Sequence, residues 1–251
     1  MTDLHSHIIP GVDDGAQTID DSLAIIEAER KDGVEQIALT SHYDPECESI
    51  DHFLNRRDQA FEKLISALQR TPEDPPRLKL GAEVLFSPRL GEMDTEKLCL
   101  EGTHLLLMEF PELRRPYYLN ETIYSLQTMG IIPLIAHVER YSFVMRDPSI
   151  LYDWIAAGAY AQVNAGTLIR SRRDSIIWRL ISDNLVQIIA SDTHSVEHRP
   201  PNLRSGYTCL RKRLGNEIAE RVAENAAIMF NGGEPDTGSF YLPKKVFGFW
   251  R

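Results

Sequence analysis

The alternation of short apolar runs with amphipathic segments constrains the fold of this 251-residue chain more than any other feature. Strand-like runs lie at residues 2–7, 36–42, 78–84, 104–110, 131–139, 159–165 and 185–192. Helix-like segments separate them, at residues 20–33, 52–69, 118–130, 149–158 and 175–184. A strand–helix alternation repeated about seven times predicts a parallel α/β fold. The runs are mostly apolar on both faces, as buried parallel strands require.

The same pattern continues along the chain without a linker or a low-complexity stretch. A chain of this length can bury a sizeable core, and it fits one domain of α/β-barrel size or two small ones. We expect residues 1–251 to form a single domain, with an irregular extension carrying aromatic residues from about Gly232 onward.

Composition narrows the classes of partner and the compartment. A formal net charge of −10 argues against a nucleic acid, because a phosphate backbone binds to basic surfaces. Cys47, Cys99 and Cys209 have no paired spacing, which suits a reducing cytoplasm. No apolar run reaches the length of a membrane span. We therefore expect a cytoplasmic protein that neither inserts into a membrane nor binds nucleic acid.

Histidines and carboxylates recur at the carboxyl ends of the predicted strands, where the sites of parallel α/β proteins form. His5 and His7 are two residues apart on an extended segment, so their side chains project to the same side. The full set is His5, His7, Asp14, His42, Glu83, Glu109, His137, Asp192 and His194. Any one of these alone would more often be a structural residue, but carboxylates gathered at one edge repel unless cations neutralise them. Imidazole and carboxylate donors together favour zinc, manganese or iron over calcium.

These residues lie in segments that resemble a known family. The segments are HSHIIPGVDDG, TSH, GAEV, MEF, IAHVERY and SDTHSVEHRP, in the order typical of the polymerase and histidinol phosphatase (PHP) superfamily. Within it, residues from Thr2 to about Asn225 resemble the bacterial capsule-regulating, metal-dependent protein-tyrosine phosphatases of the CpsB, CapC and YwqE type. The resemblance implies a distorted seven-stranded (β/α) barrel with three divalent metal ions at its carboxyl-terminal mouth. It also implies an enzyme that reverses the tyrosine phosphorylation controlling exopolysaccharide export.

The resemblance also assigns a role to each candidate residue. One metal ion would be held by His5, His7, Glu83 and Asp192. A second would share Glu83 and add Glu109 and His137, and a third would take Asp14, His42 and His194. We expect manganese, with iron or zinc as alternatives. A shared carboxylate keeps two metals about 3.5–4 Å apart, as in two-metal hydrolases, so Glu83 is counted among the catalytic residues.

Arg140 and Arg199 follow metal-ligand positions on predicted strand-end loops. A surface salt bridge is the usual role of an arginine, but a guanidinium is also well suited to hold phosphate through parallel hydrogen bonds. The resemblance assigns both arginines to phosphate binding, and we predict that they are catalytic.

Other phosphatase and hydrolase mechanisms can be tested on the sequence. A thiol-based tyrosine phosphatase needs an arginine six positions after its cysteine, but those positions hold Phe53, Leu105 and Gly215. The chain also contains no G-x-S-x-G elbow and no G-x-x-x-x-G-K-[ST] phosphate loop. The sequence therefore argues against thiol, serine-hydrolase and P-loop mechanisms.

Three kinds of function remain compatible with the ligand pattern. The first is a phosphatase acting on a phosphotyrosine protein, which we expect to be the tyrosine-rich tail of a bacterial tyrosine kinase. The second is a small-molecule phosphoesterase, such as a histidinol-phosphate phosphatase, with the same metals in an enclosed pocket. The third is a module that keeps metals only to hold its fold, which the complete ligand set and the two arginines disfavour. The lack of a long lid insertion favours an open site and a protein substrate.

Overall fold

The structure is a computed structural model that describes residues 1–251 except 73, 113–114, 244, 247–248 and 251. Its strands are β1 (Thr2–Asp3), β2 (Gln36–Leu39), β3 (His42–Tyr43), β4 (Arg77–Leu80), β5 (Glu83–Leu85), β6 (Leu105–Glu109), β7 (Ile132–Ile135), β8 (Tyr160–Asn164), β9 (Ile188–Ala190), β10 (Lys245–Val246) and β11 (Phe249–Trp250). Its α-helices are α1 (Ile19–Asp32), α2 (Ile50–Leu68), α3 (Leu119–Thr128), α4 (Ser142–Arg146), α5 (Ser149–Ala156), α6 (Ala165–Arg170), α7 (Ile176–Ser182), α8 (Leu203–Leu214) and α9 (Asn216–Phe230). Short 3₁₀ helices are η1 (Pro88–Glu92), η2 (Thr95–Leu98) and η3 (Val138–Arg140). Among the described residues, no helix combines the length and the apolar character needed to cross a bilayer.

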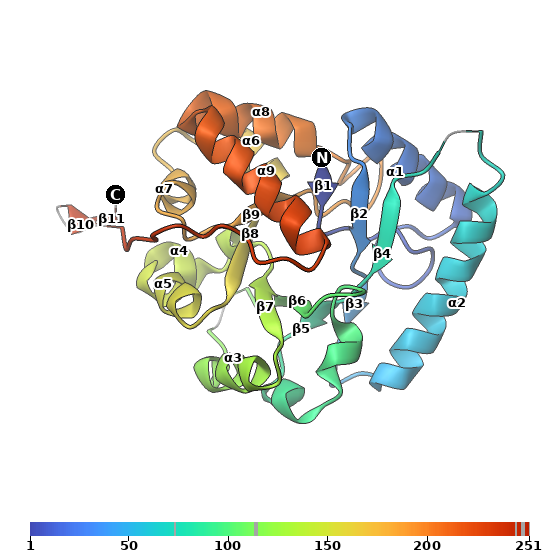
Figure 1. Cartoon of the computed structure of the whole chain (residues 1–251), viewed down its shortest axis with the longest axis horizontal. Coiled ribbons are helices and arrows are strands. Elements are labelled where there is room, and N and C mark those ends of the chain that lie inside the picture. The colour runs from blue at the N-terminus through green and yellow to red at the C-terminus, as the bar shows by residue number, and fades with distance from the viewer. Residues whose placement is uncertain (73, 113–114, 244, 247–248, 251) are drawn as a thin grey trace.

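Two parallel sheets form the centre of the fold. The first has the strand order β1-β2-β4 and the second has the order β3-β5-β6-β7-β8-β9. Every neighbouring pair in both sheets is parallel. The helices surround these strands, with α1 and α2 on the right of Figure 1 and α4, α5 and α7 on its left. The predicted parallel α/β fold is therefore confirmed.

The predicted seven-stranded (β/α) barrel is corrected by the structure, because the described residues form two sheets and no closed barrel. The ladder is interrupted between β2 and β3 at residues 40–41 and between β4 and β5 at residues 81–82. In the segments that follow β1 and β9, Ser6 and Thr193 form an isolated parallel bridge beyond the ends of both strands. The strand segments follow one another in space, but the pairing is not continuous.

Beside β1, two side chains take backbone N–H groups as hydrogen-bond partners. The N–H of Ser6 donates to Oγ1 of Thr40 at 3.0 Å. The N–H of Ser191 donates to the carboxylate of Asp3 at 3.1 Å. In each case a side-chain oxygen accepts an N–H that would otherwise donate to a carbonyl of the neighbouring strand. The ladder between the two strands therefore breaks at that point.

Local sequence signals set the ends of α1, the first helix. The hydroxyl of Thr18 accepts the N–H of Asp21, and the carboxylate of Asp21 accepts the N–H of Thr18, which forms a capping box. The helix ends at Gly33, which adopts the left-handed conformation at φ 87°. Its inner face buries Ile25 and Ile26 against the core. The helix end expected at Gly33 is confirmed.

Like the other strands of the two parallel sheets, β7 and β9 are shorter than predicted, and the residues beyond these two strands turn sharply. β7 ends at Ile135 and β9 ends at Ala190. Two residues after each end, His137 has φ 30° and Asp192 has φ 55°. Side chains other than glycine rarely adopt these values, and residues held there often lie at functional sites.

After α9 the chain continues in a segment that we call the extension. Residues 232–243 contain neither helix nor strand, and β10 then pairs antiparallel with β11. Two hydrogen bonds between the side chain of Asn225 and the backbone of Asp236 attach the extension to α9. The N–H of Tyr241 donates to the carbonyl of Asp183 at 2.9 Å, next to α7. The extension therefore packs along the helical layer.

Gly206 in α8 allows a close approach to α6, and this contact predicts a substitution effect. A Cβ atom at Gly206 would lie 2.6 Å from Cβ of Ala165. Alanine usually stabilises a helix by about 1 kcal/mol over glycine, but overpacking a core costs roughly 1–3 kcal/mol. We expect Gly206→Ala to lower the free energy of unfolding in urea, whereas Ser205→Ala on the exposed face changes it little. A Gly206→Ala protein as stable as the unsubstituted chain would contradict this packing.

Candidate metal centre

The structure gathers all nine predicted metal-ligating residues at the carboxyl ends of the strands. His5 and His7 follow β1, whereas His42 and Glu83 begin β3 and β5, the continuations of β2 and β4. The remaining residues are Asp14 in the loop before α1, Glu109 at the end of β6, His137 after β7, and Asp192 and His194 after β9. These residues come from distant parts of the sequence, and parallel pairing of the strands brings them together.

Glu83 lies at the centre of this cluster, and its side chain is only 1% exposed. Its Oε2 atom lies 3.1 Å from Nε2 of His5, 3.2 Å from Nε2 of His7 and 3.1 Å from Nδ1 of His42. Its Oε1 atom lies 2.9 Å from Nε2 of His137. One carboxylate therefore faces four imidazole rings, which is the arrangement expected of a shared ligand.

Two further carboxylates extend the inner part of the cluster. Oδ1 of Asp192 lies 3.4 Å from Nε2 of His5 and 3.6 Å from Nε2 of His7. Glu109 approaches Nδ1 of His42 at 3.1 Å and Nε2 of His137 at 3.7 Å. The residues predicted to share metal ions with Glu83 therefore approach one another to 3.4–3.7 Å. The structure also places His42 beside Glu109, a proximity that the sequence did not indicate.

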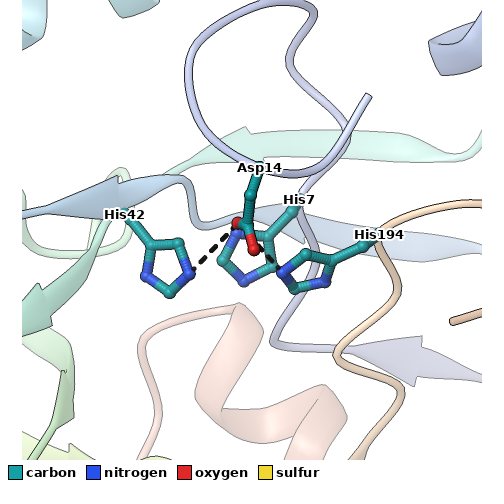
Figure 2. A group of neighbouring side chains, drawn as sticks. All are labelled: His7, Asp14, His42 and His194. Atoms are coloured by element: carbon teal, nitrogen blue, oxygen red, sulfur yellow. Dashed lines mark ion pairs between the residues drawn. The ribbon is translucent and has the colours of Figure 1, made fainter. Parts of the chain in front are cut away.

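Asp14 forms the outer part of the cluster. Its Oδ1 atom lies 3.4 Å from Nε2 of His42 and 3.3 Å from Nε2 of His194. Figure 2 shows Asp14 between these two rings, with His7 close by. The side chain of Asp14 is 67% exposed, whereas that of His194 is 6% exposed. This group therefore opens to solvent on the Asp14 side.

The donor atoms suit a divalent transition metal. Nε2 of His5 and Nε2 of His7 face each other at 3.1 Å. In the described part of the chain, buried Nδ1 of His42 and buried Oε2 of Glu83 have no hydrogen-bond partner. Buried polar atoms normally have such partners, so unpartnered atoms that converge on one space are the feature expected of a ligand site. Imidazole nitrogens and carboxylate oxygens fit manganese, iron or zinc.

Burial and neighbouring charges determine protonation in the cluster. Burial opposes charge on His7, but the hydrogen bond to Asp13 and the negative charges of Asp13 and Glu83 outweigh it and raise the His7 pKa to about 10. Burial also opposes charge on Glu83, yet the attraction of His5 and the hydrogen bond to His137 hold the Glu83 pKa well below its usual range. Burial, together with the charges of His7 and Arg199, lowers the pKa of His194 to about 4. The low pKa favours the uncharged form of His194, whereas a metal ion bound at His7 must displace a proton.

Arg140 and Arg199 lie at the rim of the cluster, each with a side chain 35% exposed. Nη2 of Arg140 lies 3.0 Å from Oδ2 of Asp192. Arg199 contacts the same oxygen and also lies 2.7 Å from Nε2 of His194 through Nη1. Both guanidinium groups therefore stand beside the candidate ligands, with exposed edges that can hold an anion.

Three polar residues that contact the cluster were missed in the sequence. Oδ2 of Asp13 accepts hydrogen bonds from Nδ1 of His7 at 2.8 Å and from the N–H of His42 at 3.0 Å. The other two, Gln162 and Asn164, lie on β8. The available signals were the first acidic residue of VDDG and the two amides in the otherwise apolar run AYAQVNA.

Comparison with solved structures indicates the class of protein. The fold matches crystal structures described as YwqE from Bacillus subtilis and CpsB from Streptococcus pneumoniae, "unique metal-dependent tyrosine phosphatases". That match has a TM-score of 0.83 and 28% sequence identity, and it covers 96% of this chain and 100% of the other. A lactonase from Listeria monocytogenes shares the fold at a TM-score of 0.55 and 14% identity, covering 90% of this chain and 93% of the other.

Sequence comparison defines the family. The family model described as "Capsular polysaccharide synthesis, CpsB/CapC" matches residues 1–231, and the chain belongs to this family. The tyrosine-protein phosphatase YwqE of Bacillus subtilis is 32% identical and is covered over its whole length, as is this chain. The tyrosine-protein phosphatase CpsB of Streptococcus agalactiae is 28% identical, over 90% of this chain and 96% of the other.

The contact between Asp13 and His7 predicts an effect on metal binding. In Asp13→Asn, an amide cannot accept from Gly15 on one side and from His7 and His42 on the other, as the carboxylate does. We expect its affinity for Mn²⁺, measured by competition with a chromophoric chelator, to fall about 10–100-fold. Asp20→Asn makes the same charge change at an exposed position and should leave the affinity unchanged. Equal affinities in the two variants would show that Asp13 does not orient His7.

Proposed function

We propose that this chain is a metal-dependent phosphatase that hydrolyses phosphotyrosine in proteins. The observation that carries the proposal is the convergence of five imidazoles and four carboxylates beside two partly exposed arginines. Its relatives YwqE and CpsB are named tyrosine-protein phosphatases, and the solved structures that it resembles are described as metal-dependent. A cluster rich in metal-ligand donors, with guanidinium groups at its rim, suits hydrolysis of a phosphate monoester.

We further propose that the site holds three divalent ions, manganese by preference and iron or zinc as alternatives. The first group is His5, His7, Glu83 and Asp192, the second is Glu83, Glu109 and His137, and the third is Asp14, His42 and His194. When bound, such ions would supply an activated water and positive charge for the phosphoryl oxygens. The short distances within each group support this assignment.

The arginines account for recognition of the phosphate. In this proposal Arg140 and Arg199 bind the phosphoryl oxygens and take up negative charge as the ester bond breaks. Asp192, which contacts both guanidinium groups, holds them beside the cluster. Glu83 acts as the catalytic carboxylate that keeps His5 and His137 around one centre.

The leaving group gives the reason to prefer phosphotyrosine. Phenolate has a conjugate acid with a pKa of about 10, far below that of an alkyl alcohol, so it departs with less help from a proton donor. The titratable residues at the centre of the cluster are the proposed ligands themselves, which suits a leaving group of this kind. The exposure of Asp14 and of both arginines favours an open site that a protein segment can reach.

We propose a bacterial tyrosine kinase, through its tyrosine-rich tail, as the protein substrate. The match to a family described by capsular polysaccharide synthesis supports a role in regulating capsule or exopolysaccharide production. Such a substrate would place the protein in the cytoplasm.

Metal content is the first test of the proposal. Protein purified without a chelator should contain up to three divalent ions per chain by elemental analysis. Removing them with a chelator should abolish phosphatase activity. It should also lower the melting temperature, because the buried carboxylates then repel one another and the stabilisation by bound ligand is lost. Metal-free protein with unchanged activity would contradict the proposal.

Substrate preference is the second test. We expect kcat/KM to be higher for a phosphotyrosine peptide than for the matched phosphoserine peptide and for histidinol phosphate. Arg199→Ala should reduce kcat/KM, and Arg199→Lys should not restore it, because an ammonium group cannot reproduce the planar guanidinium fork. A higher kcat/KM for histidinol phosphate would replace the protein phosphatase with a small-molecule phosphoesterase.

A further inference from the structure

Strand β8 carries two buried amide side chains toward the metal centre, although it supplies none of the proposed ligands. Gln162 is 0% exposed and Asn164 is 6% exposed. They are two residues apart on the strand, so both side chains project from the same face. Neighbouring strands β7 and β9 lead to His137 and Asp192. The amides therefore lie between two proposed ligands.

A continuous series of hydrogen bonds joins these amides to three proposed ligands. Oε1 of Gln162 accepts the N–H of His137 at 2.7 Å and lies 3.3 Å from Nδ1 of His5. Nε2 of Gln162 donates to Oδ1 of Asn164 at 2.7 Å. Nδ2 of Asn164 donates to Oδ2 of Asp192 at 2.7 Å. The series thus connects residues that follow β1, β7 and β9.

The direction of every bond in the series follows from one backbone group. The N–H of His137 can only donate, so the amide group of Gln162 must turn its oxygen toward it. Nε2 of Gln162 must then face Asn164, which fixes the amide of Asn164 with its Nδ2 toward Asp192. Flipping either amide would place two donors or two acceptors against each other. The orientation is therefore determined by the network.

The same direction determines which nitrogen of His5 carries its hydrogen. Nδ1 of His5 faces Oε1 of Gln162, an acceptor, so the hydrogen belongs on Nδ1. When His5 binds a metal ion as a neutral imidazole, Nε2 then offers its lone pair, and it points toward Glu83 and Asp192. At the other end, Asn164 holds Oδ2 of Asp192, while Oδ1 of Asp192 faces the proposed ligands.

We propose that Gln162 and Asn164 are positioning residues of the metal centre. Gln162 fixes the tautomer of His5 so that Nε2 is available to a metal ion, and Asn164 aims the Oδ1 atom of Asp192 at the same ion. Outer hydrogen bonds of this kind typically change metal affinity about 10–100-fold. The proposal rests on the metal centre within the proposed function, and it does not depend on the substrate.

Gln187 offers a matched control for Gln162. It is 2% exposed, its Oε1 accepts the N–H of Ala161 at 2.8 Å, and its Nε2 donates to the carbonyl of Asn184 at 2.8 Å. It is therefore a buried glutamine that, like Gln162, accepts a backbone N–H, but none of its bonds reaches a proposed ligand. In Gln162→Leu and in Gln187→Leu alike, one buried backbone N–H loses its acceptor.

The test measures Mn²⁺ affinity by chelator competition in Gln162→Leu, Asn164→Leu and Gln187→Leu. We expect Gln162→Leu to weaken binding about 10–100-fold, Gln187→Leu to leave it unchanged, and Asn164→Leu to fall between them. The smaller effect at Asn164 is expected because Arg140 and Arg199 still contact Asp192. Equal affinity in Gln162→Leu and Gln187→Leu would overturn the proposal.

A second measurement reads the tautomer directly. In Zn²⁺-loaded protein labelled with ¹⁵N-histidine, NMR should show His5 with its hydrogen on Nδ1 in the unsubstituted chain and in Gln187→Leu. Gln162→Glu keeps an acceptor at Oε1, so His5 should retain this tautomer even if Gln162→Leu fails to fold. A hydrogen on Nε2 of His5 in the unsubstituted chain would overturn the proposal. Neither measurement uses a phosphate ester, so failure of the phosphatase proposal would be recognised separately.

Discussion

The contact of one buried carboxylate with four imidazoles is the interaction on which the site depends. Glu83 is enclosed by His5, His7, His42 and His137. Taking an isolated carboxylate out of water costs several kcal/mol, so a buried carboxylate requires partners of positive charge or a metal ion. The pKa values of neighbouring carboxylates depend on charged partners in the same way. Asp192, close to His5 and His7, has a pKa far below its usual range despite burial, whereas burial raises the pKa of Asp3, one layer behind the cluster.

The backbone conformation brings the partner side chains to Glu83. His137 and Asp192 have positive φ at the points where β7 and β9 end, a conformation that costs of order 1–3 kcal/mol for such residues. These turns bring their side chains to Glu83 and His5. Gly15 contributes in another way, since a Cβ atom there would lie 2.1 Å from the carbonyl oxygen of His7. The loop that carries Asp13 and Asp14 can therefore fold tightly over His7 only with glycine at that position.

Much of this arrangement could be predicted from the sequence, because it follows from periodicity. Alternating strands and helices indicated a parallel fold, and parallel strands bring their carboxyl ends together, so His5, Glu83 and His137 were expected to meet. The interrupted pairing beside β1 could not be predicted, since it depends on side chains such as those of Thr40 and Asp3 that take backbone partners across the fold. The amides of β8 were also missed. Their role depends on which side chains they contact. The spacing of polar residues in an apolar strand does not show those contacts.

We propose that the cluster around Glu83 binds divalent metal ions. Anomalous diffraction from crystals grown with Mn²⁺, recorded on both sides of the manganese absorption edge, tests it most directly. We expect anomalous peaks between Glu83 and the rings of His5, His7 and His137, and beside Asp14, His42 and His194. A map without such peaks, with these side chains still packed around Glu83, would contradict it.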